Sequence, residues 1–221
     1  MLDAAAWGAS GTGRGCAAAL VIVLCGCSGA PEGPVGLLFE GDSDIEGWDT
    51  SGYPDSANVG VGGAVCQDVL GTIEDRLEAY QPSRVVLVCG ENDLWEQSVS
   101  QTFGDFSDVV STINRSGATV YYMGTKPEPE TAKLHEEYRQ YDGLIRAHAE
   151  ALAESGQASL VMIDVYPGFE AVGNPSSLYQ DDNLHLSDEG YALWDEWLSM
   201  AFTDDRCIIW ESGGCQRALR R

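Results

Sequence analysis

The sequence predicts an α/β fold, a three-layer α/β/α sandwich around a central parallel sheet of about five strands. Short, nearly continuous apolar runs recur along the chain, and such runs are typical of strands buried on both faces of a parallel sheet. Amphipathic stretches with helical spacing separate these runs, as the helices of crossover connections do. The 221 residues are enough for one medium-sized domain and too few for two comfortable ones.

The strands are identified by their apolar runs and by the residues that bound them. The clearest run is Arg84-Val-Val-Leu-Val-Cys89, which is rich in β-branched residues and lies between Pro82 and Gly90. The weakest is the run at residues 57–61. In chain order, we predict strands at residues 35–39, 57–61, 84–89, 118–123 and 160–164.

The helices are identified by apolar residues three or four positions apart. In residues 65–80, for example, Val65, Val69, Ile73 and Leu77 share one face. In chain order, we predict helices at residues 65–80, 101–116, 131–155 and 187–202. Because ligands of open parallel sheets bind beyond the carboxyl ends of the strands, functional motifs should follow the strands directly. The predicted domain spans residues 35–203.

The first 34 residues predict a leader and a tether outside the fold. Arg14 precedes an apolar run at residues 16–24, which is too short to span a bilayer and has the layout of a secretory signal. The run ends in Leu24-Cys-Gly-Cys27, which resembles the lipobox of bacterial lipoproteins with Cys27 as the lipidated residue. We therefore expect a signal peptide at residues 1–26, a lipid-anchor tether at residues 27–34, and an exported envelope protein, periplasmic or attached to the outer membrane. A plain cleaved signal and a wrongly assigned start are the alternatives.

The charge balance excludes some partners. The chain has 12 basic and 35 acidic residues, for a net charge of -23. Such a surface repels the phosphate backbone of nucleic acids. It also repels anionic lipid headgroups, so we expect membrane attachment only through a lipid anchor.

Cysteine use agrees with an oxidising compartment. Cys207 and Cys215 flank a stretch that contains Gly213-Gly214, and we predict that they form a disulfide in a C-terminal tail of residues 204–221. Cys89 lies in an apolar strand, either as a buried free thiol or bonded to Cys66. The sequence leaves these two alternatives open.

Four polar clusters follow predicted strands or lie in the last loop, where a functional site is expected. They provide the groups that hydrolysis by a serine requires: a hydroxyl on a sharp turn, a base, a carboxylate that orients the base, and donors for an oxyanion. The clusters are Glu40-Gly-Asp-Ser43, Asn58-Val-Gly-Val-Gly-Gly63, Gly90-Glu-Asn-Asp93 and Asp181-Asp-Asn-Leu-His185.

Each group can be assigned to a residue. Ser43 supplies the hydroxyl, His185 is the base, and Asp182, three residues earlier, orients its imidazole. The backbone N–H groups of Ser43 and Gly63 and the side-chain amide of Asn92 are the expected oxyanion donors.

These clusters resemble the sequence blocks of the SGNH, or GDSL-type, serine hydrolase superfamily, from Val35 to about Trp197. The resemblance implies a flavodoxin-like SGNH hydrolase fold and a catalytic set matching Ser43, Gly63, Asn92, Asp182 and His185, with neither a cofactor nor a metal. Lys126-Pro-Glu-Pro129 also resembles one bacterial branch of that superfamily.

The chain departs from the superfamily pattern at two positions. Asp44 stands where an aliphatic residue is usual, and Glu91 where a small residue or threonine is common. We expect this added negative charge to disfavour anionic substrates.

The expected function is hydrolysis of small acyl esters, acetylated sugars or lysophospholipids. Trp48 and Trp95 closely follow two of the clusters, so both are candidates for substrate contact. The loops at residues 44–56, 94–100 and 166–181 carry no motif that would define the substrate further.

Two other functions remain as alternatives. One is a non-catalytic envelope lipoprotein that binds a ligand on the same fold. The other is a metal-dependent phosphoesterase, although the spacing of its candidate ligands fits no zinc or calcium motif. Those ligands are Asp42, Asp44, Asp93, Asp181 and His185.

Overall fold

The computed structural model describes residues 33–156 and 160–203 in full, and the backbone alone at residues 207–211 and 214–217. The predicted signal peptide and the predicted lipidation site Cys27 lie outside the described residues, and so do the side chains of the proposed Cys207–Cys215 disulfide. Within the described ranges, no helix combines the length and the apolar character needed to cross a bilayer.

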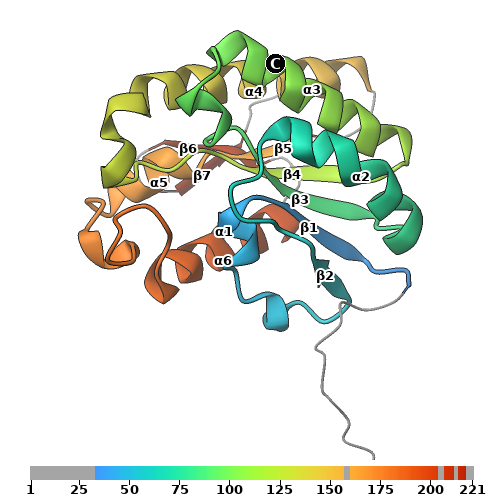
Figure 1. Ribbon diagram of the computed structural model, residues 1–221, viewed down its shortest axis with the longest axis horizontal. Helices are drawn as coiled ribbons and strands as arrows, with labels where there is room; N and C mark the ends of the chain where they lie inside the picture. The colour runs from blue at the N-terminus through green and yellow to red at the C-terminus, as the bar shows by residue number, and fades with distance from the viewer. Residues whose placement is uncertain (1–32, 157–159, 204–206, 212–213, 218–221) are drawn as a thin grey trace, which may run out of the picture.

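A five-stranded sheet forms the centre of the molecule (Figure 1). Its strands lie in the order β2-β1-β3-β4-β5, and every neighbouring pair is parallel. The predicted architecture is therefore confirmed. The strands are β1 (Leu37–Gly41), β2 (Ser56–Asn58), β3 (Arg84–Val88), β4 (Thr119–Met123) and β5 (Leu160–Ile163).

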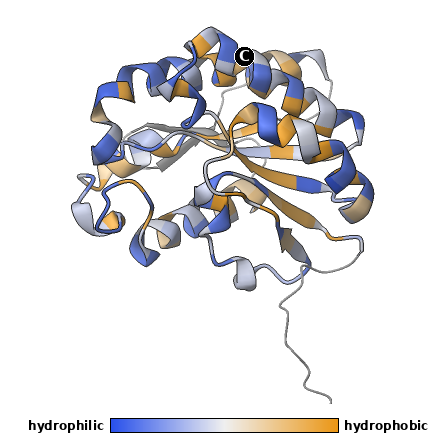
Figure 2. Cartoon of the chain, in the orientation of Figure 1, coloured by the Kyte–Doolittle hydropathy of each residue, from blue (hydrophilic) through white to orange (hydrophobic). Residues whose placement is uncertain are grey.

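Helices cover both faces of the sheet (Figure 1). One face carries α2 (Cys66–Tyr80), α3 (Val99–Arg115) and α4 (His135–Ser155), and the other carries α1 (Ser43–Glu46), α5 (Val165–Ala171) and α6 (Asp188–Thr203). Alternate strand residues face the two helical layers, since successive side chains of a strand point to opposite faces. In β3, Val85 and Leu87 pack with the first layer and Val86 and Val88 with the second. Figure 2 shows hydrophobic strands between helices that carry many hydrophilic residues.

Short elements complete the fold. Four 3₁₀ turns occur among the described residues: η1 (Thr50–Gly52), η2 (Asp93–Trp95), η3 (Pro129–Leu134) and η4 (Ser176–Leu178). The strands β6 (Cys207–Glu211) and β7 (Gly214–Arg217) form a separate antiparallel hairpin. In its register, Cys207 lies opposite Arg217 and Cys215 lies opposite Trp210.

The structure differs from the predicted elements at several places, two of which involve longer helical segments. A short helix, α5, occupies part of the loop predicted at residues 166–181; Pro167 lies in its first turn, where its missing N–H is not required. The long helix predicted at residues 131–155 begins only at His135, because Thr131 has non-helical φ/ψ of −102° and 21°.

Strand order determines where polar segments meet. The strands β1, β3 and β4 are consecutive neighbours in the sheet and run in the same direction. The segments that follow them, residues 42–44, 89–95 and 124–128, therefore meet at one edge of the sheet.

Candidate active site

Ser43 lies at the sharp turn between β1 and α1. Gly41 has a φ of +151°, and a Cβ at that position would collide with the carbonyl oxygen of Val88, so the turn requires glycine. Asp42 caps α1, with its Oδ1 accepting a hydrogen bond of 3.0 Å from the backbone N of Asp44. Ser43 is the first residue of α1, so the helix does not use its backbone N–H.

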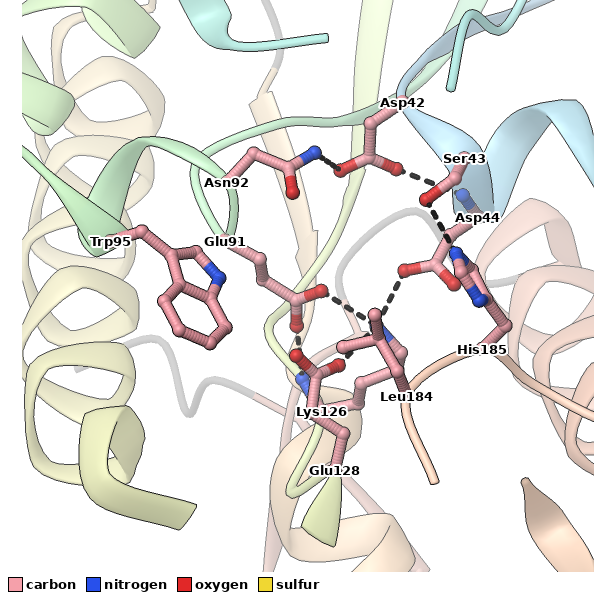
Figure 3. Close-up of a pocket in the computed structure, with 10 residues that line it drawn as sticks. All are labelled: Asp42, Ser43, Asp44, Glu91, Asn92, Trp95, Lys126, Glu128, Leu184 and His185. Atoms are coloured by element: carbon pink, nitrogen blue, oxygen red, sulfur yellow. Dashed lines mark hydrogen bonds and ion pairs between the residues drawn. The ribbon is translucent and has the colours of Figure 1, made fainter. Parts of the chain in front are cut away.

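His185 connects Ser43 to Asp182. Its Nε2 lies 3.1 Å from Ser43 Oγ, and its Nδ1 lies 2.6 Å from Asp182 Oδ2 (Figure 3 shows the first pair). Because a carboxylate can only accept, this network assigns the ring proton to Nδ1 and leaves Nε2 free to take the hydroxyl proton of Ser43. The structure thus brings the three predicted residues together in the order that nucleophilic catalysis requires.

The Asp182 carboxylate is held in its charged form. Its Oδ1 accepts from the backbone N of Leu184 and of His185, each at 3.0 Å. The hydrogen bond from His185 and these backbone donors lower the pKa of Asp182 to about 2. The loop is tied to the rest of the fold, since Glu130 N donates to the carbonyl of Asn183 at 3.1 Å.

Gly63 and Asn92 lie on two loops beside Ser43. Gly63 has a φ of +76°, and a Cβ on the preceding Gly62 would lie 4.0 Å from Ser43 Cβ, so this loop runs close to the serine. The Asn92 Nδ2 group donates to the carbonyl of Ala64 at 3.1 Å and, more weakly, to Asp42 Oδ2 at 3.4 Å. The loop that carries Gly63 is therefore bonded to the side chain of Asn92.

A cleft of about 300 Å³ opens beside the serine (Figure 3). Eight of its ten lining residues are polar or charged, and the other two are Trp95 and Leu184. The residues that line it are Asp42, Ser43, Asp44, Glu91, Asn92, Trp95, Lys126, Glu128, Leu184 and His185.

A buried ion cluster, formed by Lys126, Asp44, Glu91 and Glu128, lies against this cleft (Figure 3). Lys126 Nζ is 2.5 Å from Asp44 Oδ2, 2.7 Å from Glu91 Oε2 and 2.5 Å from Glu128 Oε2. The lysine is only 2% exposed. A single cation surrounded by three carboxylates leaves this part of the cleft acidic when all four groups are charged.

The electrostatics of the cluster follow from its burial. Burial opposes the charge of Lys126, but the surrounding carboxylates of Asp44, Glu128 and Glu91 outweigh it and raise the lysine pKa well above its usual value. Burial and then the nearby Glu128 raise the pKa of Glu91. Burial, followed by the charge of Asp44, raises the pKa of Asp42 to about 8.

Sequence reasoning placed neither Lys126 nor Glu128 in the site. The available signal was the segment Lys126-Pro-Glu-Pro129 directly after a predicted strand, with one of only two lysines in the chain. Asp44 and Glu91, recognised as departures from the superfamily pattern, are the partners of this lysine.

The two candidate tryptophans have different environments. Trp95 is 45% exposed and lines the cleft, with Lys133 Nζ 4.3 Å from the centre of its ring. Trp48 is 3% exposed, packs edge-on against Phe39 and Trp194, and is not part of the cleft lining. Trp48 was predicted to contact substrate because it is close to Ser43 in sequence. The prediction fails because the chain turns into the hydrophobic core directly after α1.

The cysteines and the candidate metal ligands can also be placed. Cys66 and Cys89 form a disulfide, so Cys89 is not the free thiol of the first alternative. Asp93 accepts a hydrogen bond from the backbone N of Cys66, away from the cleft lining. In the part of the chain that the structure describes, no cluster of three or more His, Cys, Asp or Glu side chains is arranged to hold a metal ion.

Solved structures share this fold at low sequence identity. A member of the lipolytic protein G-D-S-L family from Veillonella parvula is 19% identical, with a TM-score of 0.62 over 76% of this chain and 98% of its own. An acetyl-xylooligosaccharide esterase from Geobacillus Stearmophilus is also 19% identical, with a TM-score of 0.59 over 81% and 96%. The catalytic domain of a Streptococcus pneumoniae peptidoglycan O-acetyltransferase is 14% identical, with a TM-score of 0.60 over 78% and 94%.

The comparison with curated proteins found no match. At the level of families, the GDSL-like lipase/acylhydrolase model matches residues 39–193, from the middle of β1 into α6. This match covers most of the chain and includes all four polar clusters from Ser43 to His185. The chain therefore belongs to the GDSL-like lipase/acylhydrolase family.

Proposed function

We propose that this protein is a serine esterase that hydrolyses carboxylic esters with Ser43 as nucleophile, His185 as base and Asp182 as the residue that orients the base. The observation that carries the proposal is the placement of His185 Nε2 at 3.1 Å from Ser43 Oγ while Nδ1 is bonded to Asp182. Residues from the two ends of the fold meet in this arrangement, and it matches what proton abstraction from a serine requires.

The first half of the reaction acylates the enzyme. His185 Nε2 takes the proton of Ser43 Oγ while the oxygen attacks the carbonyl carbon of the ester. The backbone N–H groups of Ser43 and Gly63 stabilise the negative charge that develops on the carbonyl oxygen, and so does the Asn92 amide when it releases its long bond to Asp42 Oδ2. The tetrahedral intermediate then collapses, His185 transfers its proton to the departing alkoxide, and the alcohol leaves.

The second half releases the acid. His185 takes a proton from a water molecule, which attacks the acyl group on Ser43. The same donors stabilise the second oxyanion. The Ser43 oxygen leaves, regains a proton from His185, and the carboxylic acid product departs. Asp182 stays ionised throughout and stabilises the imidazolium that forms in each half.

The cleft favours small, neutral and polar esters among the expected substrates. An alkyl chain gains hydrophobic stabilisation only by leaving water for an apolar surface, and the buried ion cluster offers a charged one. The exposed ring of Trp95 can stack on a sugar. We therefore favour acetylated sugars over lysophospholipids; the Geobacillus relative, an acetyl-xylooligosaccharide esterase, represents the same substrate class.

We further propose that the protein is exported and anchored through Cys27. The Cys66–Cys89 disulfide supports export, because disulfides persist mainly in oxidising compartments. Export without an anchor would leave Cys27 unlipidated, which mass spectrometry of the mature protein detects.

The test compares the wild-type protein with Ser43→Ala on 4-nitrophenyl acetate, butyrate and octanoate and on acetylated xylooligosaccharides. We expect the acetyl esters to react fastest and Ser43→Ala to lower kcat by up to about 10⁶-fold, as removal of a triad nucleophile does. A fluorophosphonate probe should label the wild-type protein at Ser43.

Ser51→Ala, which changes a serine in the exposed turn η1, is the matched control and should keep full activity. Esterase activity that survives in Ser43→Ala contradicts the assignment. Activity lost on chelation by EDTA would instead support the metal-dependent phosphoesterase alternative.

A further inference from the structure

We propose that the Cys66–Cys89 disulfide is a positioning element of the oxyanion hole, because it fixes the loop that presents Gly63 relative to the loop that presents Asn92. This inference rests on the proposed function, which assigns oxyanion donors to both loops. Neither cysteine lines the cleft, so the bridge would act on catalysis through the loops that it joins.

The bond lies at the base of both loops. Cys66 is the first residue of α2 and comes three positions after Gly63, while Cys89 directly follows β3 and comes three positions before Asn92. The two Cα atoms are 5.2 Å apart. The disulfide therefore joins the two segments close to the points where each begins to present its donor.

Hydrogen bonds between the same segments depend on this spacing. The backbone N of Cys66 donates to both carboxylate oxygens of Asp93, at 3.2 and 3.1 Å. Asp93 thus accepts a hydrogen bond from a free backbone N–H group at the start of α2, which Val65 cannot cap because it has no side-chain oxygen. The Asn92 amide donates to the carbonyl of Ala64 at 3.1 Å. A change in the distance between the segments would disturb both of these contacts.

The base of the loops is packed, whereas the Gly63 loop itself is exposed. Cys66 and Cys89 are 0% and 1% exposed. The Tyr141 hydroxyl donates to the carbonyl of Cys89 at 3.1 Å and lies 3.7 Å from Cys66 Sγ. Gly63 is solvent-exposed. The donor on the exposed loop consequently depends on its buried base for a fixed position.

Loss of the bond should affect kcat rather than KM. Oxyanion donors have to lie within about 2.7–3.1 Å of the developing charge, and they act mainly in the transition state. The hydrogen bonds of Asp93 and Asn92 still join the two segments when the sulfur bridge is absent, although the spacing on which they depend is less fixed, so we expect the donors to be less well positioned without being lost. We expect an effect smaller than the roughly 10²–10³-fold cost of removing one donor.

The experiment uses two bridge-free proteins: Cys66→Ala with Cys89→Ala, and Cys66→Ala with Cys89→Val, which restores part of the lost volume. The control is Ile73→Ala, a change in the buried face of α2 that keeps the bridge and is expected to lower the urea midpoint to a similar extent. For each protein, kcat and KM on 4-nitrophenyl acetate and the urea midpoint are measured.

We expect both bridge-free proteins to lose about tenfold in kcat with KM within about twofold, while the control keeps its kcat. Wild-type kcat in a folded bridge-free protein would overturn the proposal. An equal loss of kcat in the control would also overturn it, because the bridge would then act through stability alone. Failure of the proposed function is recognised separately, by a wild-type protein without Ser43-dependent esterase activity.

Discussion

The two sides of the cleft are built differently. The proposed catalytic side, formed by Ser43, Asp182 and His185, is held by hydrogen bonds close to the surface, with the side chains of Asp182 and His185 46% and 34% exposed. The buried ion cluster consists of charged pairs around Lys126, which is 2% exposed. Both sides lie at the same cleft. Because they differ in burial, we expect one side to affect mainly the reaction rate and the other mainly the stability of the fold.

Burial determines what each side contributes. An exposed hydrogen bond or ion pair adds little to stability, because water competes for both partners. A buried charge has lost its hydration and depends on its partners, so removing one partner is strongly destabilising. We therefore expect substitutions on the catalytic side to lower the rate with little effect on folding, and substitutions in the cluster to do the reverse.

The largest effect is expected for Asp182→Asn. The side-chain amide of an asparagine can either accept a hydrogen bond from His185 Nδ1 or donate one to it, so it does not keep the ring proton on Nδ1. The wrong tautomer of a triad histidine lowers kcat by about 10⁴-fold. Because the side chain is half exposed, the free energy of unfolding should change by no more than about 1 kcal/mol, the upper value for an exposed ion pair. Steady-state kinetics and urea denaturation measure the two quantities.

The neighbouring Asp181→Asn is the matched control, since it removes the same charge from an exposed residue of the same loop. It should leave kcat within about twofold. A similar loss in both variants would show that the charge of the loop, rather than the tautomer of His185, is what matters.

The catalytic side could be predicted from the sequence because its parts follow strands. Each of Ser43, Gly63 and Asn92 lies shortly after an apolar run, and parallel strands bring such positions to one edge. His185 was placed with them by its spacing from Asp182 and by the resemblance of its block to a known superfamily. The five-strand sheet was predictable for the same reason, since apolar periodicity is a local property.

The buried ion cluster could not be predicted in this way. Its members are separated by up to 84 positions, from Asp44 to Glu128, and nothing local distinguishes a lysine that will be buried from one that stays in water. The bond between Cys66 and Cys89 and the core position of Trp48 likewise depend on packing between distant segments. These are properties of the tertiary structure, which hydrophobic periodicity does not specify.

The second effect is expected for Lys126→Met. The methionine leaves three desolvated carboxylates without their cation, and breaking a buried pair in this way costs about 3–5 kcal/mol of unfolding free energy. Lys133→Met is the matched control, because Lys133 is the only other lysine and lies exposed over Trp95. The control should cost about 1 kcal/mol at most, the usual value of an exposed cation–π contact. Equal losses in the two variants, measured by urea denaturation at pH 7, would contradict the importance of burial.

The last effect, the smallest when taken per pH unit, is a pH dependence that distinguishes the two sides. Burial raises the pKa of Asp42, beside the cluster, to about 8, and that of Glu40 to about 7. Both values lie above those of unfolded carboxyl groups, near 4. Their contribution to stability is therefore complete below about pH 4 and is lost as the pH rises through 7 and 8. Asp182, whose pKa is lowered to about 2, contributes above about pH 4 and loses its contribution only as the pH falls through 2.

Between pH 5 and pH 8 the charge of Asp182 should consequently not change, while the buried carboxylates make the unfolding free energy fall with rising pH. One such group contributes a slope of at most about 1.4 kcal/mol per pH unit. Asp42→Asn mimics the protonated carboxyl group and should flatten the slope, whereas Asp182→Asn should leave it unchanged. Urea denaturation at intervals of half a pH unit measures these slopes. An unfolding free energy that rises from pH 5 to pH 8 in the wild-type protein would contradict this expectation. It would mean that the pairing with Lys126 outweighs the desolvation of the carboxylates. The two sides would then differ in exposure but not in the pH dependence of their stability.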